Sequence, residues 1–244
     1  MSDINVQADS GQGAGFSYRI DYRPAFALAT LVLAPDQPIK AQAGVMVSMS
    51  GNVELESKME GGVWSALKRS VGGRSAFVST YTARGGPGEL TLAPSTPGDI
   101  VPLSLTGDAY NVAASSYLAS DTGVEVDTGW GGARSFFSSD SLFVLQARGT
   151  GTVFTTSFGA LHARQLAAGE KYVVDTGHLV AWHSSMAYEI NKATRSLFRS
   201  LTSGEALVAA FTGPGTLLLQ TRNLHAFADS LEPFLPQPTS NSNS

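Results

Sequence analysis

The sequence predicts an all-β protein in which one module is repeated three times in tandem. The chain holds 26 glycines among 244 residues, and its apolar runs are short, with few stretches of helical periodicity. A turn that begins and ends with glycine recurs three times, each time ahead of an apolar run. Corresponding segments recur after about 62 to 71 residues, a regular spacing that indicates internal repetition.

The repeat divides the chain into six segments. The first segment is polar and glycine-rich, without the basic start and apolar run of a signal peptide, so we expect a disordered arm. Pro233 and Pro236 end a predicted helix, and a polar tail follows it. In chain order we therefore expect a disordered arm, three β modules, a C-terminal helix and a disordered tail over residues 1–15, 16–93, 94–157, 158–222, 223–236 and 237–244.

Each module contains a strand in which inward and outward residues alternate. In module 1, Val53 and Leu55 are predicted to point inward and Glu54 outward, because successive side chains of a strand lie on opposite faces. Glu125 and Glu189 hold the corresponding positions in our alignment of modules 2 and 3. The three glutamates form either an acidic ring able to hold cations or the ordinary polar face of exposed strands.

A connector follows each alternating strand. In the first connector Trp64 and Leu67 precede Lys68 and Arg69 at helix-like spacing. This loop is predicted either to contact a membrane or partner, or to pack over the end of a sheet.

The glycine turn closes each module. Near the end of the chain, Gly213, Pro214 and Gly215 join apolar runs over residues 207–211 and 216–220, and we interpret the pair as a hairpin. The other two copies of the turn are formed by Gly86, Pro87 and Gly88, and by Gly149 and Gly151, the last without proline.

Composition excludes several classes of function. The formal net charge of −4, with only five lysines, argues against nucleic-acid binding, which depends on neutralising phosphates. The absence of cysteine excludes disulfides and thiolate metal sites, and fits a reducing, cytoplasmic location. Apolar runs fall well short of the roughly 18 residues that suggest a membrane span.

Few motifs indicate catalysis. Three Asp-Thr-Gly triplets begin at Asp121, Asp127 and Asp175, but they do not occupy equivalent positions of the repeat, as the paired carboxylates of an aspartic protease would. His178 and His183 are offset by five residues, which places them on opposite faces of a strand. We therefore expect no enzyme activity, no metal site and no cofactor.

Four segments resemble one protein family. They are FTGPGTLLLQTRN over residues 211–223, ADSLEPFLP over 228–236, ALKRSVGG over 66–73 and GGPGELTLAP over 85–94. Together they resemble the mitochondrial-biogenesis AIM family. The resemblance implies three short double-stranded β-helix modules similar to the subunit of the tryptophan RNA-binding attenuation protein, assembled as a homotrimer with a nine-module ring. It supplies no catalytic residues.

These observations lead to two hypotheses. The first is a non-enzymatic oligomeric assembly protein, a ring-forming homotrimer with a possible protein or membrane-associated partner and no nucleic acid. The alternative is a module that binds a small molecule, an amino acid or a nucleotide, at the junctions between repeats.

Overall fold

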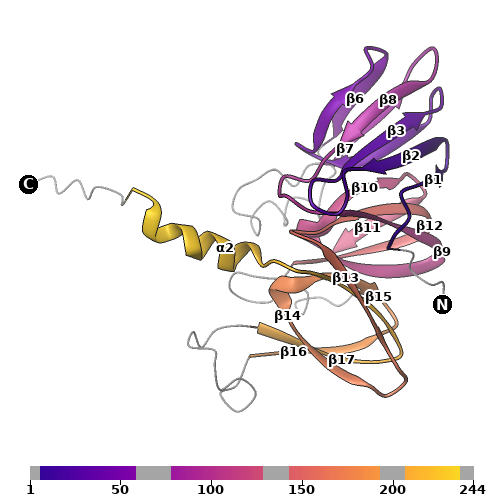
Figure 1. The fold of residues 1–244 in the computed structure, drawn as a ribbon. Helices are drawn as coiled ribbons and strands as arrows, with labels where there is room; N and C mark the ends of the chain where they lie inside the picture. The colour runs from indigo at the N-terminus through magenta and orange to yellow at the C-terminus, as the bar shows by residue number, and fades with distance from the viewer. Residues whose placement is uncertain (1–5, 59–77, 129–142, 193–206, 237–244) are drawn as a thin grey trace, which may run out of the picture.

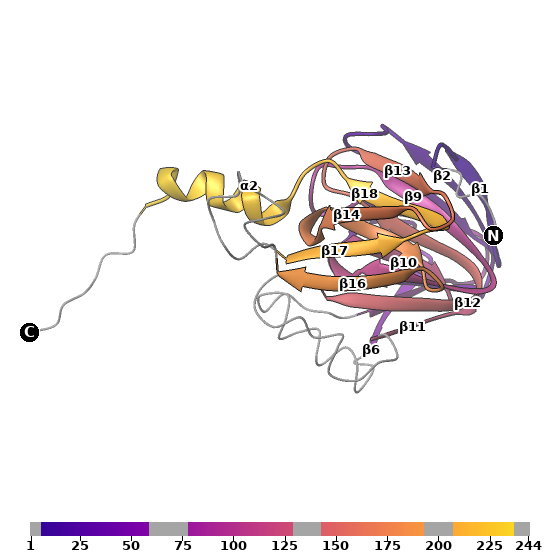
Figure 2. The ribbon, with the colours of Figure 1, turned by 90° about the horizontal axis from the view of Figure 1, so that it is seen from below.

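Strands dominate the computed structural model, which describes residues 6–58, 78–128, 143–192 and 207–236 (Figure 1). Within these ranges a single α-helix, α2 (Leu224–Leu231), lies near the C-terminus. The predicted all-β class and the short C-terminal helix are therefore confirmed. Both views place α2 on the side of the molecule away from the N-terminus (Figures 1 and 2).

Within each described range, the strands follow one another through short connections. In chain order they are β1 (Ser10–Gly13), β2 (Phe16–Asp21), β3 (Leu28–Leu33), β4 (Pro38–Gln42), β5 (Met46–Met49), β6 (Val53–Lys58), β7 (Val78–Ala83), β8 (Gly88–Leu92), β9 (Ile100–Ala113), β10 (Tyr117–Asp121), β11 (Val124–Thr128), β12 (Val144–Thr156), β13 (Leu161–Leu166), β14 (Lys171–Asp175), β15 (Leu179–His183), β16 (Ala187–Lys192), β17 (Leu207–Thr212) and β18 (Gly215–Gln220). Short 3-10 turns follow β9 (Ala114–Ser116), β14 (Thr176–His178) and α2 (Glu232–Phe234).

The strands form three sheets. A five-stranded sheet has the order β1-β2-β3-β8-β5, and a three-stranded sheet has the order β14-β17-β16. Between them lies a ten-stranded sheet with the order β13-β18-β15-β9-β12-β10-β4-β7-β6, in which β11 also pairs with β12. The pairing of named strands is antiparallel throughout the described residues.

One order of pairing occurs three times along the chain. In the first repeat β3 pairs with β8, β8 with β5, β4 with β7 and β7 with β6. In the last repeat β13, β14, β15, β16, β17 and β18 pair in the same order. In the central repeat the two halves of β9 and of β12 each serve as two strands, with β10 and β11 between them.

The register repeats as well as the order. The third strand of each repeat has an irregularity opposite the last strand, at Val47, Leu118 and Val180. Val53, Val124 and Met186 each lie four residues after the last third-strand residue that pairs with the last strand of its repeat, so they occupy equivalent positions. All three are buried.

None of the three glycine turns is a hairpin, which corrects the prediction. Gly149 and Gly151 lie within the single strand β12. β17 belongs to the three-stranded sheet and β18 to the ten-stranded sheet, so the turn at Gly213, Pro214 and Gly215 carries the chain from one sheet to another. The turn between β7 and β8, at Gly86, Pro87 and Gly88, does the same.

The last glycine of each turn has a packing role. Gly88, Gly151 and Gly215 lie opposite the end of the first strand of their repeats. A Cβ atom would come within 2.6 Å of Val53 at Gly88 and within 2.6 Å of Asp121 at Gly151. The backbone approaches these side chains so closely that only glycine fits.

The N-terminal arm is more ordered than the sequence predicts. Ser10–Gly13 form β1, which pairs with β2 in the five-stranded sheet. Gly11 and Gly13 lie against the rings of Tyr18 and Phe16, where a side chain on β1 would clash. The polar, glycine-rich composition therefore indicates close packing over aromatic rings rather than disorder at these positions. The predicted tail, residues 237–244, lies outside the described residues.

Apolar side chains form three core clusters, each drawn mainly from one repeat but also including residues of a neighbouring one, such as Phe154 in the first, Leu218 in the second and Ala113 in the third. The first includes Leu31 and Leu90, the second Val112 and Val153, and the third Trp182 with its neighbours. In the third cluster the Trp182 ring lies 5.3 Å from that of Tyr188 and 5.5 Å from that of Phe211, both edge to face.

Candidate assembly interface

Successive repeats are joined by one kind of strand contact. The third strand of the central repeat, β10, pairs with β4, the second strand of the preceding repeat; Ser120 lies opposite Lys40. In the same way β15 pairs with β9, and Trp182 lies opposite Asn111. Each repeat therefore extends a sheet of its neighbour at an equivalent edge.

A buried carboxylate lies at the first of these junctions. The Asp121 side chain accepts hydrogen bonds from the Thr152 amide at 2.6 Å and from the Ala14 amide at 3.0 Å. Asp121 is 1% exposed, and this burial raises the pKa of its carboxyl, while the two amides lower it. Asp121 thus links the N-terminal segment to the junction between the first two repeats.

A histidine takes the equivalent place at the second junction. His183 lies opposite Tyr110, and their rings meet edge to face with centroids 5.2 Å apart. Its Nδ1 lies 2.6 Å from the Ser185 hydroxyl and its Nε2 lies 3.7 Å from an Asp108 carboxylate oxygen. Both junctions therefore hold a polar side chain within a polar network.

In the first and last repeats, the strands that correspond to these paired edges lack a second partner within the described residues. Within the described residues, β5 pairs only with β8, and β14 pairs only with β17. All four residues of β5 are exposed, Val47 by 57%, and Val173 on β14 is exposed by 43%. Open edges with apolar side chains readily pair with another chain.

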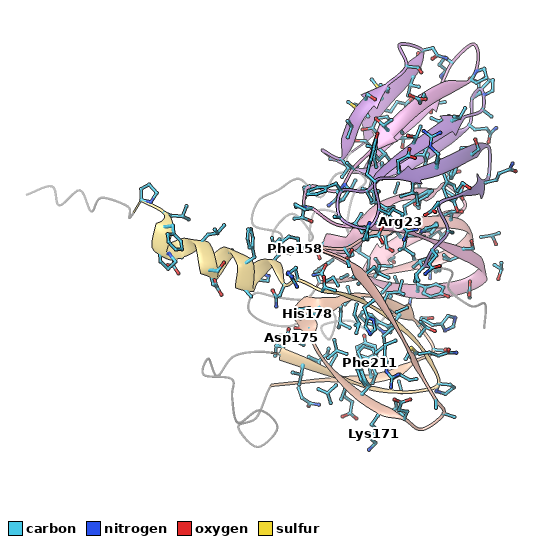
Figure 3. All side chains as sticks on the ribbon, in the orientation of Figure 1. Arg23, Phe158, Lys171, Asp175, His178 and Phe211 are labelled. Atoms are coloured by element: carbon cyan, nitrogen blue, oxygen red, sulfur yellow. The ribbon has the colours of Figure 1, made fainter. Side chains whose placement is uncertain are left out.

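Nearby side chains support the β14 edge. The Arg164 guanidinium lies over the Tyr172 ring, 5.3 Å from its centroid, and forms an ion pair with Glu170 at 2.6 Å. Lys171, the first residue of β14, lies at the outer end of the molecule (Figure 3). The edge is thus held in place while remaining accessible.

Arg23 fastens the N-terminal segment to the start of the central repeat (Figure 3). Its guanidinium donates to both oxygens of Asp99, at 2.6 and 2.9 Å, and to the Ala8 carbonyl at 3.1 Å. The hydrogen bonds to Asp99 raise the pKa of Arg23 above its already high ordinary value, so the cation is permanent. These contacts are structural.

The three candidate acidic-ring residues do not form a set of equivalent free carboxylates. Glu54 pairs with Arg84 and Glu125 with Arg148, each at 3.0 Å. The register places Ala187, rather than Glu189, at the position equivalent to Glu54 and Glu125. The repeated face is polar, and arginines neutralise part of it.

Other predicted features have structural roles or lie outside the described residues. Asp175 accepts a hydrogen bond from the Gly177 amide at 2.8 Å and so shapes the turn after β14, close to His178 (Figure 3). His178 contacts the Gln220 carbonyl at 2.7 Å through Nδ1. The candidate loop of Trp64, Leu67, Lys68 and Arg69 lies outside the described residues.

No cluster in the described part of the chain suits a metal ion. Among these residues no three of the side chains that commonly bind metals gather at one place. A search of the same residues for helices able to cross a membrane also finds none.

A cavity of about 300 Å³ lies beside the base of α2, whose Phe227 side chain is part of its lining. Its lining is mainly apolar, and it includes Phe26, Pro97, Phe158, Phe227 and the side chain of Arg222. Phe26, Gly98 and Gly159 occupy the starts of the three repeats and are joined by parallel bridges. The base of α2 closes one side of this cavity, where the rings of Phe158 and Phe227 meet at 5.4 Å (Figure 3).

Sequence reasoning did not identify the two open edges or the apolar surface of α2. The edges read as ordinary apolar strands, because a strand that pairs with another copy has the composition of a buried strand. The spacing of Leu224, Phe227 and Leu231 could have predicted an apolar face on the helix. Nothing else in the sequence indicates a surface of the same chain that would cover this face.

Comparisons with known proteins agree on one group of relatives. A family model described as mitochondrial biogenesis AIM24 matches residues 18–222. An uncharacterized protein of Streptococcus pyogenes serotype M6 is 32% identical over 228 residues, which cover 90% of this chain and 91% of the relative. A crystal structure of a protein from Streptococcus pyogenes is similar with a TM-score of 0.73 at 31% identity, and the match covers 90% of this chain and all of that one.

Proposed function

Because this chain belongs to the mitochondrial biogenesis AIM24 family, we propose that it is a non-enzymatic assembly protein whose copies join head to tail into a ring of three. In this proposal the three repeats are short double-stranded β-helix modules, similar to the subunit of the tryptophan RNA-binding attenuation protein. The observation that carries it is that β5 and β14, the complementary edges at opposite ends of the repeat series, each pair with one strand only within the described residues.

The argument begins with the junctions inside the chain. Two junctions pair the third strand of one repeat with the second strand of the preceding repeat. At the ends, β5 is a third strand without a preceding repeat, and β14 is a second strand without a following one. A β14 edge from one copy and a β5 edge from the next would supply the contact that each lacks.

The repeated register specifies this contact. Ala119 lies opposite Ala41 and Ser120 opposite Lys40 at the first junction, and the second junction repeats these positions. Transferring the same positions to β5 and β14 places Ser48 opposite Val174, Met49 opposite Val173 and Ser50 opposite Tyr172. Exposed apolar side chains on both edges, including Met49 and Val173, would become buried.

Such a contact uses two different surfaces, so it must either close into a ring or continue as a filament. Closure with three copies gives nine modules. A closed ring leaves none of these edges exposed, which removes the tendency of open apolar edges to aggregate.

Cysteine cross-linking tests the register and the closure together, since the natural chain has no cysteine. With Met49→Cys and Val173→Cys in one chain, directly opposed residues lie about 5 Å apart, within disulfide range. We expect oxidation to give products of two and three linked copies, ending at three with no free thiol. Products that continue beyond three copies, or the absence of cross-links, would contradict the ring.

A control pair checks the register. Lys171→Cys in place of Val173→Cys moves the thiol two positions along β14, to about 7 to 8 Å from Met49, which is too far for an unstrained disulfide. Cross-linking of both pairs with equal yield would show loose association rather than this interface.

A charge on the edge should dissociate the ring. We expect Val173→Asp to abolish the three-copy ring in light scattering, because the carboxylate would be buried opposite apolar Met49. Val32→Asp is the matched control: Val32 is exposed by 44% on β3, which already pairs on both sides, so this variant should keep the assembly of the natural chain.

The alternative, a small-molecule site at the repeat junctions, has weaker support. The cavity beside α2 does lie where the starts of the repeats meet, but its lining is mainly apolar and includes one cation, Arg222. Amino acids and nucleotides need several convergent polar groups.

A further inference from the structure

Helix α2 is firmly attached at its base but buries none of its residues. The Asn223 side chain caps it by accepting hydrogen bonds from the His225 and Ala226 amides at 2.9 and 3.3 Å. From this base the helix projects away from the sheets (Figures 1 and 2). An isolated helix of this length is marginal in water, so a further packing surface is needed.

One side of the helix is apolar. Leu224, Phe227 and Leu231 are 45%, 48% and 42% exposed, and their spacing places them on one face. Phe234 and Leu235, just beyond the helix, are 83% and 60% exposed. Of these side chains, Phe227 meets the Phe158 ring at the base of the helix, and the apolar stripe beyond it, toward Phe234 and Leu235, is exposed.

Charge is divided along the same segment. Asp229 and Glu232 lie toward its outer end, and Arg222 lies at its base beside the cavity. None of these three side chains forms an ion pair with another described residue. The outer end is therefore apolar and acidic, whereas the base is apolar and basic.

Two other possible partners, the chain's own C-terminal tail and an anionic lipid surface, fit the apolar stripe of α2 less well. Residues 237–244 are polar and contain no large apolar side chain, so the chain's own tail cannot cover it. Residues 223–236 contain no lysine or arginine, unlike helices that lie on anionic lipid. The complementary partner is a surface with an apolar hollow beside a cation, which is what the base of α2 provides.

We propose that α2 is a docking helix for a second copy of this chain, paired antiparallel with its own equivalent across a two-fold axis. The outer end of each helix, with Phe234 and Leu235, enters the cavity lined by Phe26 and Phe158 of the other copy. Glu232 of each helix then meets Arg222 of the other. At 1.5 Å per residue, Phe234 lies about 10 Å beyond Phe227, so the tip of one helix reaches the base of its partner.

This contact is self-complementary, and it uses surfaces separate from the β5 and β14 edges. It also places the carbonyl end of each helix near the arginine at the start of the other, which favours the antiparallel arrangement. Together with the proposed ring, it joins two rings face to face; without the ring, it forms a simple pair.

Native mass spectrometry of charge-reversal variants tests the proposal. We expect six copies for the natural chain, and three copies for Glu232→Arg or Arg222→Glu, because each reversal sets like charges against each other. The double variant, Glu232→Arg with Arg222→Glu, should restore six. All the substituted side chains are exposed, so the fold itself should be unaffected.

The outcomes separate this proposal from the ring. Three copies of the natural chain, or a single reversal that leaves six, would overturn α2 pairing while keeping the ring. Two copies of the natural chain that become one on reversal would support α2 pairing and reject the ring. With Val173→Asp, α2 pairing predicts two copies, and a single copy would count against it.

Discussion

Asp121 combines full burial with a titratable group at the junction of the first two repeats. Its carboxylate satisfies two backbone amides from segments far apart in sequence, at Thr152 and Ala14. Desolvation outweighs these hydrogen bonds and raises the pKa of the carboxyl. The contribution of Asp121 to the stability of this junction therefore depends on pH.

The pH dependence follows from this direction. Because the folded chain holds the Asp121 proton at pH values where the unfolded chain has released it, stability from this group is greatest below the ordinary aspartate pKa of about 4 and falls as pH rises through the raised value. The Asp121→Asn variant keeps an acceptor but does not titrate. We expect the stability of the natural chain relative to this variant to increase from pH 7 to pH 4 in urea unfolding.

Asp121→Ala provides the contrast. It leaves the Thr152 and Ala14 amides without their partner, which should cost about 1 to 3 kcal/mol of unfolding free energy at pH 7. A stability difference between the natural chain and Asp121→Asn that stays constant with pH would show that the carboxyl pKa is not raised in the folded state.

Short elements were predictable where the signal is local. The alternation of Val53, Glu54 and Leu55 identified β6 as a strand, but Leu55, which was predicted to point inward, is 44% exposed, so only Val53 follows the prediction. The proline signals identified the C-terminal helix. Pairing partners were not predictable, because the glycine turn has the same composition whether its strands pair with each other or enter different sheets. The contacts that decide this are more than 30 residues away in sequence, as for Gly88 and Val53.

The correspondence of the fourth strands shows the same limit. Aligning polar residues placed Glu189 with Glu54 and Glu125, whereas the register places Met186 where Val53 and Val124 lie. Burial decides the register, since Met186 and both valines are at most 5% exposed. A methionine after a turn carries little strand signal in the sequence.

The close approach of β12 to Asp121 at Gly151 should make this strand the element most sensitive to a single methyl group. At Gly151 the backbone φ is +139°, and a Cβ would lie 2.6 Å from the Cβ of Asp121. We expect Gly151→Ala to lower the unfolding free energy by about 3 kcal/mol through strain and overpacking, measured by urea unfolding.

Gly51→Ala is the matched control for this variant. No atom lies within 4 Å of a Cβ at Gly51, and its φ is outside the left-handed region, so the change should be small. Equal losses of unfolding free energy in Gly151→Ala and Gly51→Ala would mean that close packing at Gly151 does not cause the effect.

At the scale of the whole molecule, one order of strand pairing recurs along the chain, whereas the partners of the first and last edges could not be predicted. Local composition predicts a recurring module, because each copy would need the same turn and the same inward residues. Whether the first and last edges find partners depends on other copies of the chain. The sequence of β5 or of β14 is the same in a single chain and in a ring.

Hydrogen exchange can distinguish these two states without any substitution in the natural chain. If the β5 and β14 edges pair between copies, the amides of Met49 and Val173, which point away from β8 and β17, exchange slowly, as amides inside a sheet do. In Val173→Asp we expect the Met49 amide to exchange at least tenfold faster, because separated edges return to water.

An edge that is not involved provides the internal reference. β16 pairs only with β17 within the described residues, and it takes no part in either proposed contact, so exchange along Glu189 should be the same in both proteins. Rapid exchange at Met49 in the natural chain, at a concentration where light scattering reports an assembly, would mean that the copies associate through some surface other than these edges.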